Sequence, residues 1–209
     1  MIIDYDISMS FLNANQGFSF TLPESFIPED EELLHVYPGI IEAEGLFSLF
    51  IIPASKDNAT ILTTDGSDVL TCPVGTLGLP PLKEAASTSG VPLITMEDGI
   101  QRIVSWNDYR DEWINQCIIQ GCELRGFLVP ASDLQNGASY TGYLALVGSS
   151  EFDMTWSADL VFLKEGAEIF ANRSISKGFE DTVRPVPPFK PSVNDFDSMF
   201  VLQAALGKI

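Results

Sequence analysis

Carboxylate pairs come nearest to a catalytic or metal-binding pattern in this chain. Asp4 and Asp6 stand two residues apart, and Asp195 and Asp197 repeat this spacing near the other end. Two carboxylates on one strand face can share a metal ion or divide acid and base roles. Among 29 aspartates and glutamates such pairs also arise by chance. A catalytic carboxylate would need a pocket that raises its pKa, and nothing in the sequence indicates one for either pair. We therefore assign no catalytic residue to them.

Other ligand-bearing motifs are incomplete. The turn from Asp65 to Asp68 and the acidic run from Glu29 to Glu32 supply oxygen ligands, but neither matches a full calcium loop. Cys117 and Cys122 lack the second pair of ligands that a structural zinc site requires. The only histidine, His35, stands among apolar residues, which predicts a partly buried structural residue and not a general base. The sequence thus predicts no enzyme, no cofactor and no metal site.

The charge of the chain excludes several kinds of partner. The formal net charge is −18, and the first lysine or arginine is Lys56. Phosphate backbones and anionic lipid surfaces are repelled by such a field, so we expect neither direct nucleic-acid binding nor membrane binding. With 45% hydrophobic residues the chain can still bury a core, unlike an acidic disordered tail. No signal peptide or transmembrane segment is visible, which predicts cytoplasmic synthesis and is compatible with incorporation into a virion.

A periodicity of two dominates the sequence and predicts a mainly β fold. Apolar residues alternate in Phe18–Leu22, Tyr140–Val147 and Phe152–Phe162, and Gly148-Ser149-Ser150 suits a hairpin between the last two. Many short strands separated by turns favour an antiparallel β-sandwich or a jelly-roll-like barrel. The other strands expected are Ile2–Ser8, Leu46–Ile52, Thr60–Thr64, Val69–Cys72, Ile100–Trp106, Leu124–Val129 and Glu168–Asn172.

One amphipathic helix is expected between about residues 107 and 120. Its apolar stripe consists of Tyr109, Trp113, Ile114, Cys117 and Ile118. Asn107 is a suitable N-cap and Gly121 a suitable C-terminal glycine. We expect this helix to pack one face on a sheet.

The C-terminal part of the chain differs from the rest. Four prolines between Arg184 and Pro191 predict an extended arm that cannot join a central strand. We divide the chain into a β-rich domain of residues 1–183, with a subdomain break near 75–90 left open, and an arm of residues 184–209. The arm ends in an apolar segment, which either folds back on its own domain or reaches a neighbouring subunit. The candidate partner-binding residues are Pro185, Pro187, Pro188, Phe189, Pro191, Met199, Phe200 and Leu202.

These features favour a non-enzymatic structural or assembly protein. Its most concrete form is a homo-oligomeric virion or appendage subunit whose arm makes subunit contacts. The alternative is an acidic inhibitor or immunity-type protein that presents carboxylates to the basic groove of a toxin or nucleic-acid-binding enzyme. Adaptation to a saline environment would explain the acidity without any partner.

Overall fold

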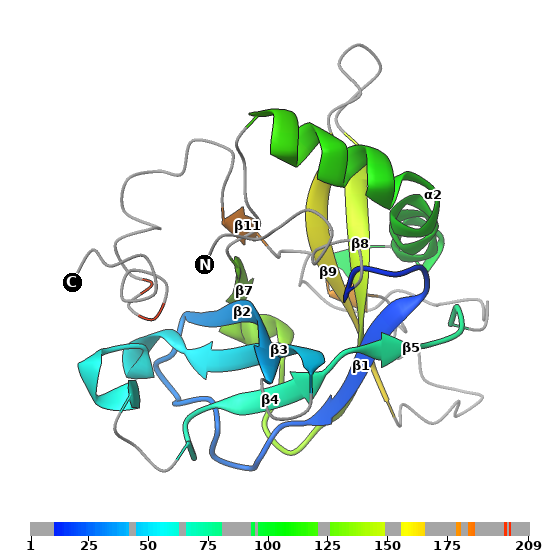
Figure 1. Cartoon of the computed structure of the whole chain (residues 1–209). Coiled ribbons are helices and arrows are strands. Elements are labelled where there is room, and N and C mark those ends of the chain that lie inside the picture. Colours follow the sequence, from blue (N-terminus) through cyan, green and yellow to red (C-terminus); the bar gives the residue numbers. More distant parts are fainter. Residues whose placement is uncertain are drawn as a thin grey trace, which may run out of the picture.

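The described strands form two antiparallel sheets packed as a sandwich (Figure 1). The computed structural model describes residues 11–41, 45–62, 66–80, 93–94, 96–120, 126–148, 156–165, 179–180, 184–186, 199 and 201. One sheet has six strands in the order β5-β1-β8-β9-β10-β6, and the other has five in the order β11-β7-β2-β3-β4. The mainly β, sandwich-like prediction is confirmed, whereas the described strands do not close into a barrel.

The long strands supply most of the pairing in both sheets. β8 and β9 pair antiparallel as predicted, from Tyr140 opposite Lys164 to Gly148 opposite Trp156, while residues 149–155, which include most of the predicted turn, lie outside the described residues. β2 and β3 form a second hairpin, paired from Leu34 opposite Pro53 to Ile41 opposite Leu46. The bounds of the strands are β1 Gln16–Thr21, β2 Leu33–Ile41, β3 Leu46–Pro53, β4 Leu70–Pro73, β5 Gly75–Thr76, β6 Leu93–Ile94, β7 Gly126–Pro130, β8 Ser139–Gly148, β9 Trp156–Lys164, β10 Phe179–Glu180 and β11 Arg184–Val186.

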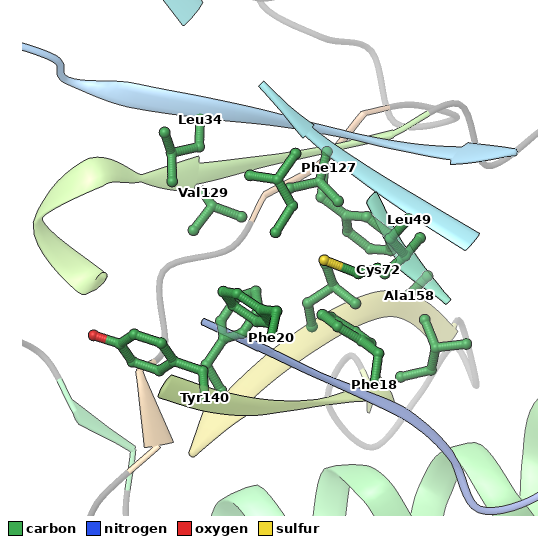
Figure 2. Packing of buried hydrophobic residues seen from close by; sticks show 14 of the residues in the cluster. Phe18, Phe20, Leu34, Leu49, Cys72, Phe127, Val129, Tyr140 and Ala158 are labelled. Carbon is green, nitrogen blue, oxygen red and sulfur yellow. The ribbon is translucent and has the colours of Figure 1, made fainter. Parts of the chain in front are cut away.

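The main hydrophobic core fills the space between the two sheets (Figure 2). Phe18 and Phe20 of β1 stack with ring centroids 5.7 Å apart, and Phe162 of β9 meets both rings edge-on. A side chain at Gly142 of β8 would place its Cβ 2.7 Å from Cε2 of Phe18, so the glycine makes room for the ring. The alternation predicted for Phe18–Leu22 thus corresponds to a buried face.

Helix α2 (Met96–Gln120) covers the outer face of the six-stranded sheet, beside β8 and β9 (Figure 1). Ile103 packs there with Tyr143 and Val161, whereas Trp106 and Trp113 join the main core. An ion pair between Arg102 and the buried Asp159 of β9, at 2.7 Å, fixes the helix on the sheet.

Several sequence predictions about this helix are corrected. The helix begins at Met96, so the strand predicted at Ile100–Trp106 is wrong. Ile100 and Ile103 are three residues apart, and packing of this helical face outweighs the β-branched propensity of isoleucine. Asn107 is not the N-cap; it lies inside the helix and exchanges hydrogen bonds with Asn15. Of the predicted apolar stripe, Trp113, Ile114 and Cys117 are buried, whereas Tyr109 is exposed. Gly121 lies outside the described residues.

Other predictions have mixed outcomes. The predicted strand at Thr60–Thr64 is wrong, because residues Ala59–Leu62 form a 3₁₀ helix. Ile61 is buried within this helix. Strands at Leu46–Ile52, Val69–Cys72 and Leu124–Val129 correspond to β3, β4 and β7 with shifted ends. The sequence prediction missed β2, whose residues are buried on both faces and therefore do not alternate. The strands expected at residues 2–8 and 168–172, and most of the break near 75–90, lie outside the described residues.

No helix within the described ranges combines the length and apolar character needed to span a membrane.

Candidate functional site

The outer face of the five-stranded sheet carries a buried polar cluster centred on Asp57. On β2, Leu34 and Val36 belong to the main core, so the alternate residues His35 and Tyr37 face the opposite side of the sheet. Asp57 follows the short 3₁₀ helix η1 (Ala54–Lys56), and its N–H donates to the carbonyl of Ala54 at 3.2 Å. This turn returns the chain over the sheet after β3, which brings the Asp57 side chain onto β2.

Asp57 accepts hydrogen bonds through both carboxylate oxygens. His35 Nδ1 lies 2.6 Å from Oδ2, and because a carboxylate can only accept, Nδ1 carries the proton of this bond. The hydroxyl of Tyr37 donates to the same oxygen. Oδ1 accepts the backbone N–H of Val201 at 3.0 Å, across 144 residues of sequence. The side chains of His35 and Asp57 are fully buried, so these bonds form away from bulk water.

An apolar cluster surrounds the polar one. Met199 is fully buried against side chains from β2, β3, β7 and the 3₁₀ helix η2 (Ala59–Leu62). Its buried neighbours are Tyr37, Ile52, Ile61 and Leu128, with Phe50, Val69 and Val201 partly buried beside them. The chain therefore folds back on its own domain at residues 199 and 201, one of the two arrangements that the sequence left open.

The Asp57–His35 pair has the carboxylate–imidazole hydrogen bond that is also found in catalytic triads. His35 Nε2 is buried and makes no hydrogen bond within the part of the chain that the structure describes. A triad needs a nucleophile on that nitrogen and an opening for the substrate. With His35 fully buried, the arrangement instead positions a backbone N–H of the C-terminal segment. His35 is thus fully buried, more deeply than the sequence predicted.

The motifs singled out in the sequence do not assemble at this cluster. Asp68 lies 4.0 Å from Lys56 in an exposed ion pair, and Glu31 accepts hydrogen bonds from Ser55 at the surface. Cys117 is buried. The described residues hold no group of three or more histidine, cysteine or acidic side chains placed to bind a metal ion. The pairs Asp4/Asp6 and Asp195/Asp197, and Cys122, lie outside the described residues.

The thiol of Cys72 is not a reactive group. It lies in the main core between the sheets, fully buried (Figure 2). Burial raises the pKa of this thiol to about 12, because the charged thiolate would lose its hydration. At neutral pH it is therefore protonated and a poor nucleophile.

The candidate partner-binding residues fall into three groups. Pro185 lies in β11, opposite Phe127 of β7, at the edge of the five-stranded sheet as expected for a proline-containing strand. Met199 lies in the apolar cluster described above. The remaining candidates lie outside the described residues: Pro187, Pro188, Phe189, Pro191, Phe200 and Leu202.

Sequence reasoning missed Asp57 as a site residue. The residue stands in the polar stretch Ser55-Lys56-Asp57-Asn58, whose composition indicates only a turn. Its partners are 20, 22 and 144 residues away, and no local pattern encodes contacts over such separations. The apolar character of Met199 was the one available signal.

A polar hollow lies elsewhere on the surface. It has a volume of about 670 Å³ and is open to solvent. Exposed Glu24 and Glu165 line it, and Lys164 in the same wall bonds to Gln135 at 2.6 Å. Carboxylates there are accessible to a basic group from outside.

Comparison with protein-family models, with curated proteins and with solved structures finds no match to this chain.

Proposed function

We propose that this chain is a non-enzymatic structural or assembly protein, an oligomeric subunit of the virion or appendage type whose C-terminal arm makes contacts between subunits. The supporting observation is that the body of the domain has a surface that receives the chain end: within this chain Met199 is buried there and Asp57 accepts the N–H of Val201. A distant chain end that inserts one apolar side chain and one backbone N–H into a prepared surface is a docking element. Double-sheet sandwiches of the jelly-roll kind occur in viral capsid subunits, and exchange of an identical element between subunits is a low-cost route to oligomers.

The proposal is tested by the mass of the protein in solution. Multi-angle light scattering of the full chain over a range of concentrations should give a defined oligomer. Replacing Met199 with Asp buries a charge among apolar side chains and should shift the mass toward the monomer.

Ile119→Asp is the matched control, since Ile119 is 85% exposed on α2 and the same charge is introduced outside the apolar cluster that contains Met199. This variant should keep the mass of the wild type. A wild-type chain that is monomeric at every concentration contradicts the proposal.

The polar hollow favours a second candidate function, an acidic inhibitor or immunity-type protein. Its exposed Glu24 and Glu165 could receive a lysine or arginine from the basic groove of a toxin or nucleic-acid-binding enzyme. Such a partner should remain bound at about 0.5 M salt, where the Debye length falls to about 4 Å and non-specific attraction is lost. Charge reversal by Glu24→Lys should weaken that binding without changing the mass of the free protein.

A further inference from the structure

We infer that the site holding Met199 and Val201 accepts the same segment from a second copy of the chain. This inference rests on the proposed function, because it needs neighbouring subunits, and it identifies the surface through which they would engage. The docking site is defined here as Asp57 together with the apolar neighbours of Met199, namely Tyr37, Ile52, Ile61 and Leu128.

The apolar half of the docking site belongs entirely to the body of the domain. Its walls come from β2, β3, β7 and η2, which all precede the arm in sequence. Met199 is fully buried there, and Val201 packs partly buried against the same cluster. Burying one methionine contributes about 1.5–3 kcal/mol. This favours the docked state of the segment but still allows it to dissociate.

The polar half selects the orientation of the segment. Asp57 Oδ2 is held by His35 and Tyr37, so Oδ1 is fixed and points to one backbone N–H. Recognition of a backbone N–H does not depend on which copy supplies it. A segment from a second subunit would make the same hydrogen bond and the same methionine contact.

The length of the connection permits this exchange. Residues 187–198 separate β11 from Met199. A stretch of that length spans at most about 40 Å when extended. This exceeds the radius of gyration of a domain of this size, which is about 17 Å. The three prolines at 187, 188 and 191 favour extended conformations. Exchange of an identical element between subunits is then a low-cost route to an oligomer, because no new contact has to be created.

The experiment offers the segment as a separate molecule to the full chain. Full-length Met199→Ala and Met199→Asp variants, whose own segment is weakened, serve as receptors, and circular dichroism verifies that they are folded. A fluorescent peptide of residues 192–205 represents the second copy. Fluorescence anisotropy should show saturable binding to both receptors, and weaker binding to the wild type, whose site is occupied.

Substitutions in the peptide and in the receptor test the individual contacts. A peptide with Val201→Pro lacks the N–H that Asp57 accepts, and its affinity should fall at least about tenfold while the receptor stays intact. Asp57→Asn in the receptor should weaken binding similarly. Glu31→Gln is the matched control: it changes another carboxylate near the same turn that bonds only to the exposed Ser55, and it should leave affinity unchanged.

Each outcome decides a separate point. A folded receptor that does not bind the peptide, or a Val201→Pro peptide that binds as well as the original, overturns the inference. A wild-type chain that is monomeric, while its Met199 variants bind the peptide, refutes the proposed oligomeric function and leaves the docking site in place. If the wild-type chain is an oligomer but its folded Met199 variants do not bind the peptide, the docking inference is refuted and the proposed oligomeric function stands.

Discussion

Replacing Asp57 with alanine should destabilise the fold strongly, because this carboxylate is the common acceptor of three donors. His35 is fully buried and Tyr37 is 6% exposed, so water does not readily replace the lost acceptor. A buried donor left without its partner costs about 1–3 kcal/mol. Allowing for some relaxation and for water near the half-buried Val201, we expect the free energy of unfolding to fall by about 3–5 kcal/mol. Typical domains have only about 5–15 kcal/mol in total.

The assay is urea denaturation followed by tryptophan fluorescence, with a double-mutant cycle between positions 35 and 57. Asp57→Ala leaves the buried imidazole N–H of His35 without its acceptor. His35→Leu removes this N–H, so no buried donor is left without a hydrogen bond. The double variant should therefore be more stable than the sum of the two single changes predicts, by at least about 1 kcal/mol. Hydrogen exchange should also show faster exchange of the Val201 amide in Asp57→Ala.

Two results would refute this reasoning. One is an Asp57→Ala variant within about 0.5 kcal/mol of the wild type, the range of an ordinary surface change. The other is strict additivity of His35→Leu and Asp57→Ala, which would mean that the two side chains do not share a buried bond. Glu31→Gln, at the surface, should stay within the same 0.5 kcal/mol.

Three further predictions concern the packing and ionisation of the sandwich. Gly142→Ala should lower the free energy of unfolding by about 1–3 kcal/mol, because its Cβ would overlap a buried phenylalanine ring, whereas Gly75→Ala, with open space around it, should be near neutral in the same urea titration. Arg102→Gln should cost about 1–3 kcal/mol, because it leaves the buried carboxylate of Asp159 without its ion pair; an unchanged unfolding midpoint would contradict this. Burial raises the pKa of Cys72 to about 12 from 9.0, so its proton is held more tightly in the folded state; stability should fall above pH 9 by up to about 1.4 kcal/mol per pH unit, and Cys72→Ala should reduce this slope.

Strand positions could be predicted where one face of a sheet is buried. Residues Phe18 and Phe20 alternate with polar neighbours, and the same holds in β8 and β9, so a period of two was visible. β2 was not predicted, because its outer face is covered by the turn after β3 and by Met199, so the consecutive residues 34–37 are all buried and the strand shows no alternation of apolar and polar residues. Ile100–Trp106 was read as a strand although helical packing against β8 decides its state.

The sequence by itself determined the mainly β class and the formal net charge of −18. These follow from composition and from local periodicity. Only the tertiary structure decided that the one histidine, a carboxylate from a polar turn and a backbone N–H near the chain end meet at one point. Their bonds cross 22 and 144 residues, and such meetings depend on how sheets and turns stack in space, which no local pattern of residues specifies.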